Sequence, residues 1–110
     1  MCAARRRPLL TLETFDDPDE VVVVVRGELD VTSSPSLVEH LDRLAVAGAS
    51  RVTLDCRHVA FVDASGLGAL LAARDRLEGD GRAITLRHPS PVMRRLLHLA
   101  DLSGAFLVEP

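Results

Sequence analysis

The chain has 110 residues, a net charge of -3 and 47% hydrophobic residues, with no Trp, no Tyr and three Phe. This length predicts one domain with one aliphatic core, and the acidic balance gives no reason to expect nucleic acid as a partner. The longest apolar run, residues 21–25, is too short to cross a membrane. Cys2 and Cys56 offer no disulfide framework, so we expect two unpaired thiols and a cytoplasmic protein.

Residues 1–8 are expected to form a flexible basic arm, because Arg5, Arg6 and Arg7 stand there without hydrophobic periodicity. The domain itself is expected over residues 9–110. Residues 9–14 alternate as in a short strand, and the DDPD of residues 16–19 predicts a turn. Five consecutive valines in residues 21–26 predict a central strand buried on both faces, which ends at the GELD of residues 27–30.

A first helix is expected to begin with Ser34 as N-cap and Pro35 in the first helical position, and to end at Gly48. Its buried face is expected to carry Leu37, Val38, Leu41, Leu44 and Ala45.

The central stretch, residues 51–77, changes from strand periodicity to helical periodicity across the DASGLG of residues 63–68. Asp63 and Ser65 are both suited to capping the helix that follows, and Gly66 permits close approach of a partner backbone. The free amides of the helix's first turn favour negative charge at this position.

Residues 83–86 predict a further strand, and Ser90-Pro91 predicts the start of a last helix. We expect the inward residues of that helix to be Val92, Leu96, Leu99 and Met93, with Leu102 packed beneath its end. Residues 105–108 complete the order ββαβαβαβ as a final strand.

Catalytic motifs are not found. Gly66-Leu67-Gly68 lacks the spacing and the lysine of a phosphate-binding loop, and Ser65 lacks the G-x-S-x-G setting of a hydrolase nucleophile. The histidines are scattered over separate elements without metal-ligand spacing: His40, His58, His88 and His98. We therefore expect no metal, no cofactor and no enzyme activity.

Two motifs together resemble the STAS family, specifically the bacterial anti-sigma factor antagonists. They are the GELD of residues 27–30 and the pattern D-x3-V-x-F-V-D-x-S-G-L-G over residues 55–68. The resemblance covers about residues 9–108, and the spacing of Val92, Leu96, Leu99 and Leu102 resembles the family's closing helix. It implies a single mixed sheet of four to five strands packed against three to four helices. Asp101 departs from the family's usual Gly, but Asp tolerates the left-handed backbone that ends a helix.

The resemblance also implies the function. Family members bind an anti-sigma factor, often one with a GHKL-type serine kinase fold, and so release a sigma factor for transcription. The implied binding surface comprises Asp30, Thr32, Ser33, Asp63, Ala64, Ser65, Gly66, Leu67 and Gly68.

Regulation is where this sequence departs from the family. Ala64 stands where the family usually has its phosphoacceptor serine. Either Ser65 is the acceptor, in which case a serine phosphatase is a further partner, or the protein is not phosphorylated, or it is regulated by abundance or by a partner. We slightly favour the second possibility, because Ser65 is expected to be occupied as a helix cap. The alternative function is a STAS-type sensor or scaffold that binds a small anionic ligand or nucleotide within a signalling or transport assembly.

Overall fold

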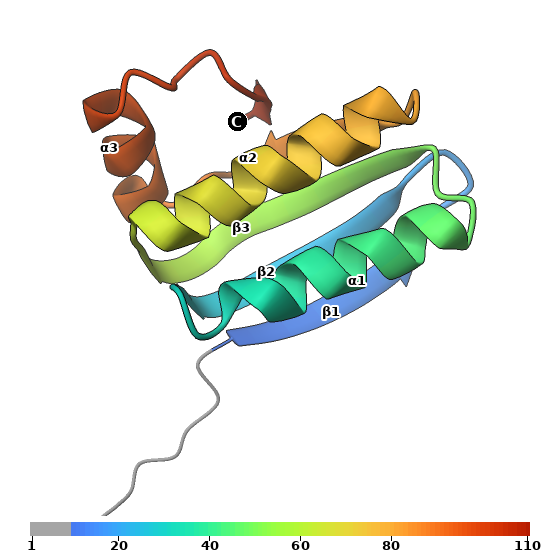
Figure 1. Cartoon of the computed structure of the whole chain (residues 1–110), viewed down its shortest axis with the longest axis horizontal. Helices are drawn as coiled ribbons and strands as arrows, with labels where there is room; N and C mark the ends of the chain where they lie inside the picture. The colour runs from blue at the N-terminus through green and yellow to red at the C-terminus, as the bar shows by residue number, and fades with distance from the viewer. Residues whose placement is uncertain (1–9) are drawn as a thin grey trace, which may run out of the picture.

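The computed structural model describes residues 10–110, and Figure 1 shows their arrangement. The elements in chain order are β1 (Leu10–Asp16), β2 (Val21–Leu29), α1 (Ser34–Val46), β3 (Arg51–Val62), α2 (Ala64–Gly79), β4 (Ala83–Arg87), α3 (Pro91–Leu99) and β5 (Leu107–Glu109). The predicted order ββαβαβαβ is confirmed. The predictions for the basic arm, for Cys2 and for a strand start at residue 9 lie outside the described residues.

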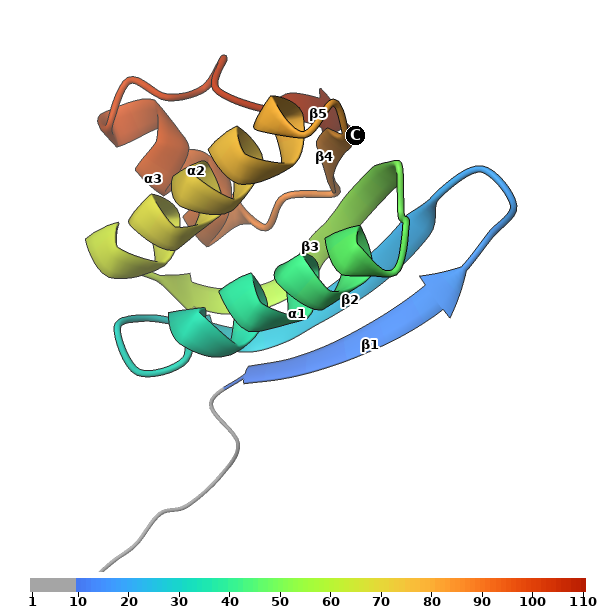
Figure 2. The same ribbon diagram turned by 45° about the vertical axis from the view of Figure 1, so that its right-hand side comes forward.

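The five strands form one mixed sheet in the order β1-β2-β3-β4-β5. β1 is antiparallel to β2, and the other neighbours are parallel. Helices α1 and α2 lie side by side on one face of this sheet, and α3 lies beside the start of α2 (Figures 1 and 2). A mixed sheet of five strands with three helices confirms the expected fold class.

The core is aliphatic, as the composition requires. Its largest fully buried side chains come from β2, β3, β4 and all three helices: Leu29, Leu37, Leu41, Leu54, Leu70, Ile84, Leu86, Met93, Val23, Val25, Val52 and Val59. Cys56 is also buried in this core as an unpaired thiol, and its burial raises its pKa to about 12. The helices in residues 10–110 are all too short or too polar to cross a membrane.

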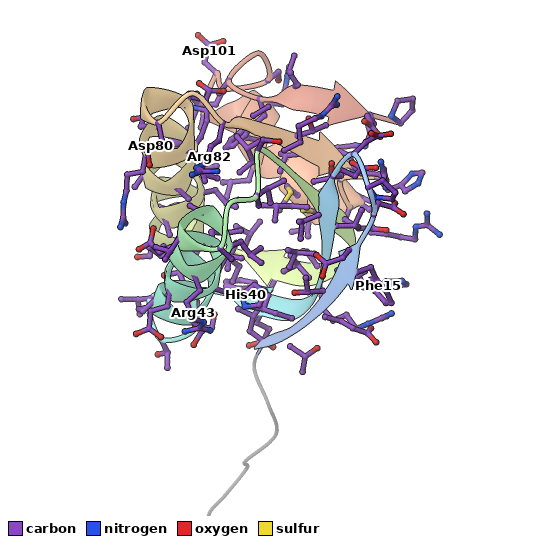
Figure 3. The ribbon with its side chains drawn as sticks, turned by 90° about the vertical axis from the view of Figure 1, so that its right-hand side faces the viewer. Phe15, His40, Arg43, Asp80, Arg82 and Asp101 are labelled. Carbon is purple, nitrogen blue, oxygen red and sulfur yellow. The ribbon has the colours of Figure 1, made fainter. Side chains whose placement is uncertain are left out.

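The valine strand is internal, as predicted, but it is not buried on both faces. Val23 and Val25 are buried beneath the helices, whereas Val22 and Val24 on the opposite face are only half-buried. Val22 pairs with Phe15 of β1, which is 50% exposed and points away from α1 and α2 in Figure 3. Helices cover only one face of this part of the sheet. The prediction of burial on both faces, which rested on the continuous valine run, is therefore wrong.

Several predicted boundaries differ from the structure by one to three residues. β2 ends within the GELD motif, as predicted, but it continues three residues beyond Arg26 to Leu29, through an irregular register at Gly27, whose φ is 106°. This positive φ explains why the motif needs a glycine there. α1 begins at Ser34 after Ser33 as N-cap, so the predicted cap at Ser34 is one residue late.

The last helix follows the sequence closely at its ends. Ser90 caps α3 by accepting a hydrogen bond from the Met93 amide at 3.4 Å, and the expected left-handed residue follows the helix at Asp101, whose φ is 60°. The predicted inward face is confirmed for Met93 and for Leu96, which is partly buried against the core, but it omitted Leu97 and wrongly included Leu99. Met93 and Leu97 are buried, and Leu99 is 68% exposed.

Candidate docking surface at the start of the second helix

Two loops meet where the parallel strands β2 and β3 end. Leu29 pairs with Val62 across the sheet, and the amide of Asp63 donates to the Leu29 carbonyl at 3.3 Å. The loop of residues 30–33 therefore lies against the turn of residues 63–68, so all nine predicted site residues come together. We call these two segments the docking surface.

The first of these loops is folded around one carboxylate. Asp30 Oδ1 accepts hydrogen bonds from the amides of Thr32 and Ser33, both at 3.0 Å, and from the Ser33 hydroxyl at 3.2 Å. These bonds, led by that from the Ser33 amide, lower the pKa of Asp30. The Ser33 hydroxyl also donates to the Glu28 carbonyl at 2.6 Å. Ser33 is buried by these contacts, so it holds the loop's shape from within.

In the second loop, the residue that caps α2 is Asp63. Its Oδ1 accepts from the Gly66 amide at 2.9 Å, and its carbonyl accepts from the Leu67 amide at 2.9 Å. Ser65 lies two residues too late to cap, because it is already the second residue of the helix. Its side chain is exposed and makes no hydrogen bond within the described residues. The prediction that Ser65 is a cap is therefore wrong. The expectation that Ser65 is not phosphorylated rested on that role, so it loses its reason.

Gly66 fixes how closely α2 approaches the sheet. A Cβ atom at this position would lie 2.2 Å from the Leu29 carbonyl oxygen and 2.8 Å from its carbonyl carbon. The expected close approach of a backbone therefore occurs within this chain, where β2 meets the start of α2. Gly68, two residues later, has nothing within 4 Å of its would-be Cβ.

The surface left for a partner is partly apolar. Of the predicted residues, Thr32, Ala64, Ser65 and Gly68 are exposed, whereas Ser33, Gly66 and Leu67 are buried and support them. The sequence prediction did not include two exposed hydrophobic residues near them in the chain: Val31, 69% exposed, in the first loop, and Phe61, 44% exposed, two residues before Asp63. The sequence did contain a signal for Val31: it is an apolar residue inside the polar loop D-V-T-S, where no core position is expected, so exposure could have been predicted.

We predict that alanine at the two candidate caps has opposite consequences. Asp63→Ala should lower the free energy of unfolding by about 1 kcal/mol, because the Gly66 amide loses its acceptor. Ser65→Ala should leave it unchanged or slightly higher, since Ala is the better helix former. Urea denaturation of both variants measures the difference, and a larger loss for Ser65→Ala would contradict the assignment.

The opposite end of the sheet carries a hollow of about 400 Å³. It lies between the β1–β2 turn, the end of α1 and the start of β3, and four carboxylates line it: Asp16, Asp17, Asp19 and Glu20. Arg51 is the only cation in its lining. This hollow is therefore unsuited to an anionic ligand.

Comparison with known proteins places this architecture in a family. The family model described as "Mlab, STAS domain" matches residues 14–109. An anti-sigma-B factor antagonist of Bacillus subtilis (strain 168) is 30% identical over 96 residues, which are 86% of this chain and 84% of that protein. A STAS-domain containing protein of Pseudomonas aeruginosa (strain UCBPP-PA14) is 27% identical over 93 residues, which are 84% of this chain and 91% of that protein. The crystal structure of an anti-sigma factor antagonist from Mycobacterium paratuberculosis has a TM-score of 0.81 and 27% identity, and the match covers 92% of this chain and 86% of that one.

A mixed five-stranded sheet with paired loops at the ends of β2 and β3 is the STAS fold. The chain belongs to the STAS domain family, and its relatives include proteins named anti-sigma factor antagonists. The resemblance seen in the two sequence motifs is thereby confirmed. Both motifs fall at one place in the structure, because GELD ends β2 and DASGLG begins α2.

Proposed function

We propose that this protein is an anti-sigma factor antagonist, which binds an anti-sigma factor and so releases a sigma factor for transcription. It acts by binding and not by catalysis. Homology to proteins of that name supports the class of partner. The observation that carries the proposal is the contact of Asp63 and Gly66 with Leu29, because it brings the nine predicted site residues to one end of the sheet.

The chemistry of this surface indicates what it would contact. The exposed apolar side chains of Val31 and Ala64 stand in the same two loops as the hydroxyl groups of Thr32 and Ser65. An interface of this composition favours a partner with an apolar centre and polar groups around it. A kinase-type anti-sigma factor with a GHKL fold is the partner that we propose.

We further propose that Ser65 is the phosphoacceptor. Its hydroxyl is exposed and has no hydrogen bond within the described residues, so modification costs no existing contact. It also lies in the first turn of α2, where the helix dipole favours negative charge. A phosphate there would bring a charge of about -1.5 to -2 into the docking surface and weaken an apolar interface. A serine phosphatase would then restore binding.

The alternative function, a sensor of a small anion or nucleotide, has less support. Such a ligand needs a hollow that complements its charge. The hollow at the β1–β2 turn has the wrong charge, since carboxylates dominate its lining.

The proposed function is tested with the tagged full chain as bait in an extract of its native host. Wild type should retain a protein with a GHKL-type kinase fold, identified by mass spectrometry. Gly68→Arg should lose it, because the new side chain projects from the docking surface into open space. Gly79→Arg is the matched control: its position is equally open but lies at the far end of α2. If wild type retains no such kinase, or if both variants retain it equally, the proposal is wrong.

A further inference from the structure

One face of α3 is exposed and basic. The helix buries Met93 and Leu97 and exposes the opposite side. Because consecutive helical residues are about 100° apart, the exposed side chains follow one another around a single arc. These side chains are Arg94, His98, Arg95 and Leu99. Leu99 is 68% exposed.

The two arginines on this face carry charges that no carboxylate offsets. Within residues 10–110, neither Arg94 nor Arg95 forms an ion pair. The Nε of Arg94 donates only to the Pro89 carbonyl, at 3.1 Å. Asp101 is the single carboxylate in residues 88–108. Four arginines on other elements, by contrast, each have a carboxylate partner: Arg43, Arg74, Arg76 and Arg87.

A preformed apolar groove of about 220 Å³ lies beside this face, lined by Pro89, Arg94, Leu97, Ser103 and Val108. Its far wall is β5, which is held in place from β4. Arg87 Nε donates to Glu109 at 2.8 Å, and the His88 amide donates to the Glu109 carbonyl at 2.9 Å. Arg94 therefore stands at the rim of a groove whose walls are fixed.

We propose that this α3 face, together with the groove, is a second docking surface and binds a protein segment in which carboxylates flank an apolar side chain. The apolar side chain would enter the groove beside Leu97 and Val108, and the carboxylates would pair with Arg94 and Arg95. Charge complementarity selects this occupant, because neither arginine of this face has a carboxylate partner within residues 10–110, whereas Glu109 on the neighbouring β5 is paired with Arg87. An anionic membrane is disfavoured by the net charge of -3 and by the small number of exposed cations. RNA is disfavoured by the same net charge, and the face offers no Phe, Tyr or Trp for stacking.

The test uses the isotope-labelled full chain and a short synthetic peptide in which Glu alternates with Leu. Amide resonances of α3 and β5 should shift on titration, and those of residues 63–68 should not. The double variant Arg94→Glu/Arg95→Glu should bind the peptide at least about tenfold more weakly. The matched control Arg26→Glu/Arg57→Glu also reverses two exposed arginines without ion pairs, on β2 and β3, and should bind as wild type does. A peptide with Ser in place of Leu should bind about tenfold more weakly, because nothing fills the groove.

Several results would overturn this proposal. Equal losses of peptide affinity in the two double variants would show a general charge effect. Shifts of amide resonances confined to residues 63–68 would place the peptide on the docking surface instead of on α3. Stronger binding to phosphatidylglycerol vesicles or to polyuridine RNA, dependent on Arg94 and Arg95, would assign the face to a membrane or to RNA. Urea denaturation of each variant checks that the fold is kept. The anti-sigma factor plays no part in the titration, so this proposal and the proposed function can fail separately.

Discussion

Gly66→Ala is expected to lower the free energy of unfolding by about 3 kcal/mol, at the upper end of what overpacking costs. The added Cβ would lie 2.2 Å from the Leu29 carbonyl oxygen. A backbone atom cannot rotate away as a side chain can, so either the start of α2 or the end of β2 must move. The same movement would separate the two loops of the docking surface, and we therefore expect partner binding to fall together with stability.

Gly68→Ala is the matched control for this substitution. It adds the same methyl group to the same helix, where nothing lies within 4 Å, and it removes a glycine from a helix interior. We expect Gly68→Ala to raise the free energy of unfolding by about 0.5 to 1 kcal/mol. Urea denaturation of the two variants gives the comparison. Similar changes of the same sign in both would show that the contact with Leu29 is not what requires Gly66.

Ser65→Glu is expected to weaken binding of the anti-sigma factor at least about tenfold, a loss of about 1.4 kcal/mol or more. The added carboxylate imitates part of a phosphate's charge and would be desolvated against an apolar partner surface. The fold should be unaffected, because Ser65 is exposed in the first turn of α2, where the helix dipole favours the charge. Isothermal titration calorimetry with the purified partner measures the change in affinity.

Ser50→Glu is the control for Ser65→Glu. Ser50 is also exposed, but it precedes β3 and so lies at the end of the strand remote from the docking surface. Unchanged affinity is expected for Ser50→Glu.

A separate experiment tests whether Ser65 is phosphorylated: the wild-type chain is incubated with the candidate kinase and ATP and then analysed by mass spectrometry. Phosphate on Ala64→Ser but not on the wild-type chain would show that the serine must stand at position 64.

The order of elements was predictable because periodicity reports local structure, and each change of period in this chain is sharp. Which of two nearby residues caps a helix was not predictable. Ser33 and Ser34 are equally good capping residues by type, and Ser33 takes the N-cap position although its hydroxyl donates to the Glu28 carbonyl and makes no capping bond. At α2 the choice was between Asp63 and Ser65, and Asp63 is the cap because its carboxylate reaches the Gly66 amide.

The inward face of α3 could not be predicted in full from the sequence, for a similar reason. This helix has nine residues, and apolar side chains occupy several overlapping faces of it. Packing against β3 buries Met93 and Leu97, so Leu99 is left in solvent. The candidate docking residues, in contrast, were predicted from family motifs. Val31 was missed because no motif marks it. Phe61 stands inside the family motif of residues 55–68, but the motif does not tell which of its apolar residues the fold leaves exposed.

The bond between the Asp63 amide and the Leu29 carbonyl has a kinetic consequence. Because Gly66 packs against the same carbonyl, the two loops are expected to move together as one rigid unit in the free protein. A partner that meets this surface then has little backbone to order, and the entropic cost of association is reduced. Association should therefore proceed in a single fast phase, and a charge at position 65 should act mainly by shortening the lifetime of the complex.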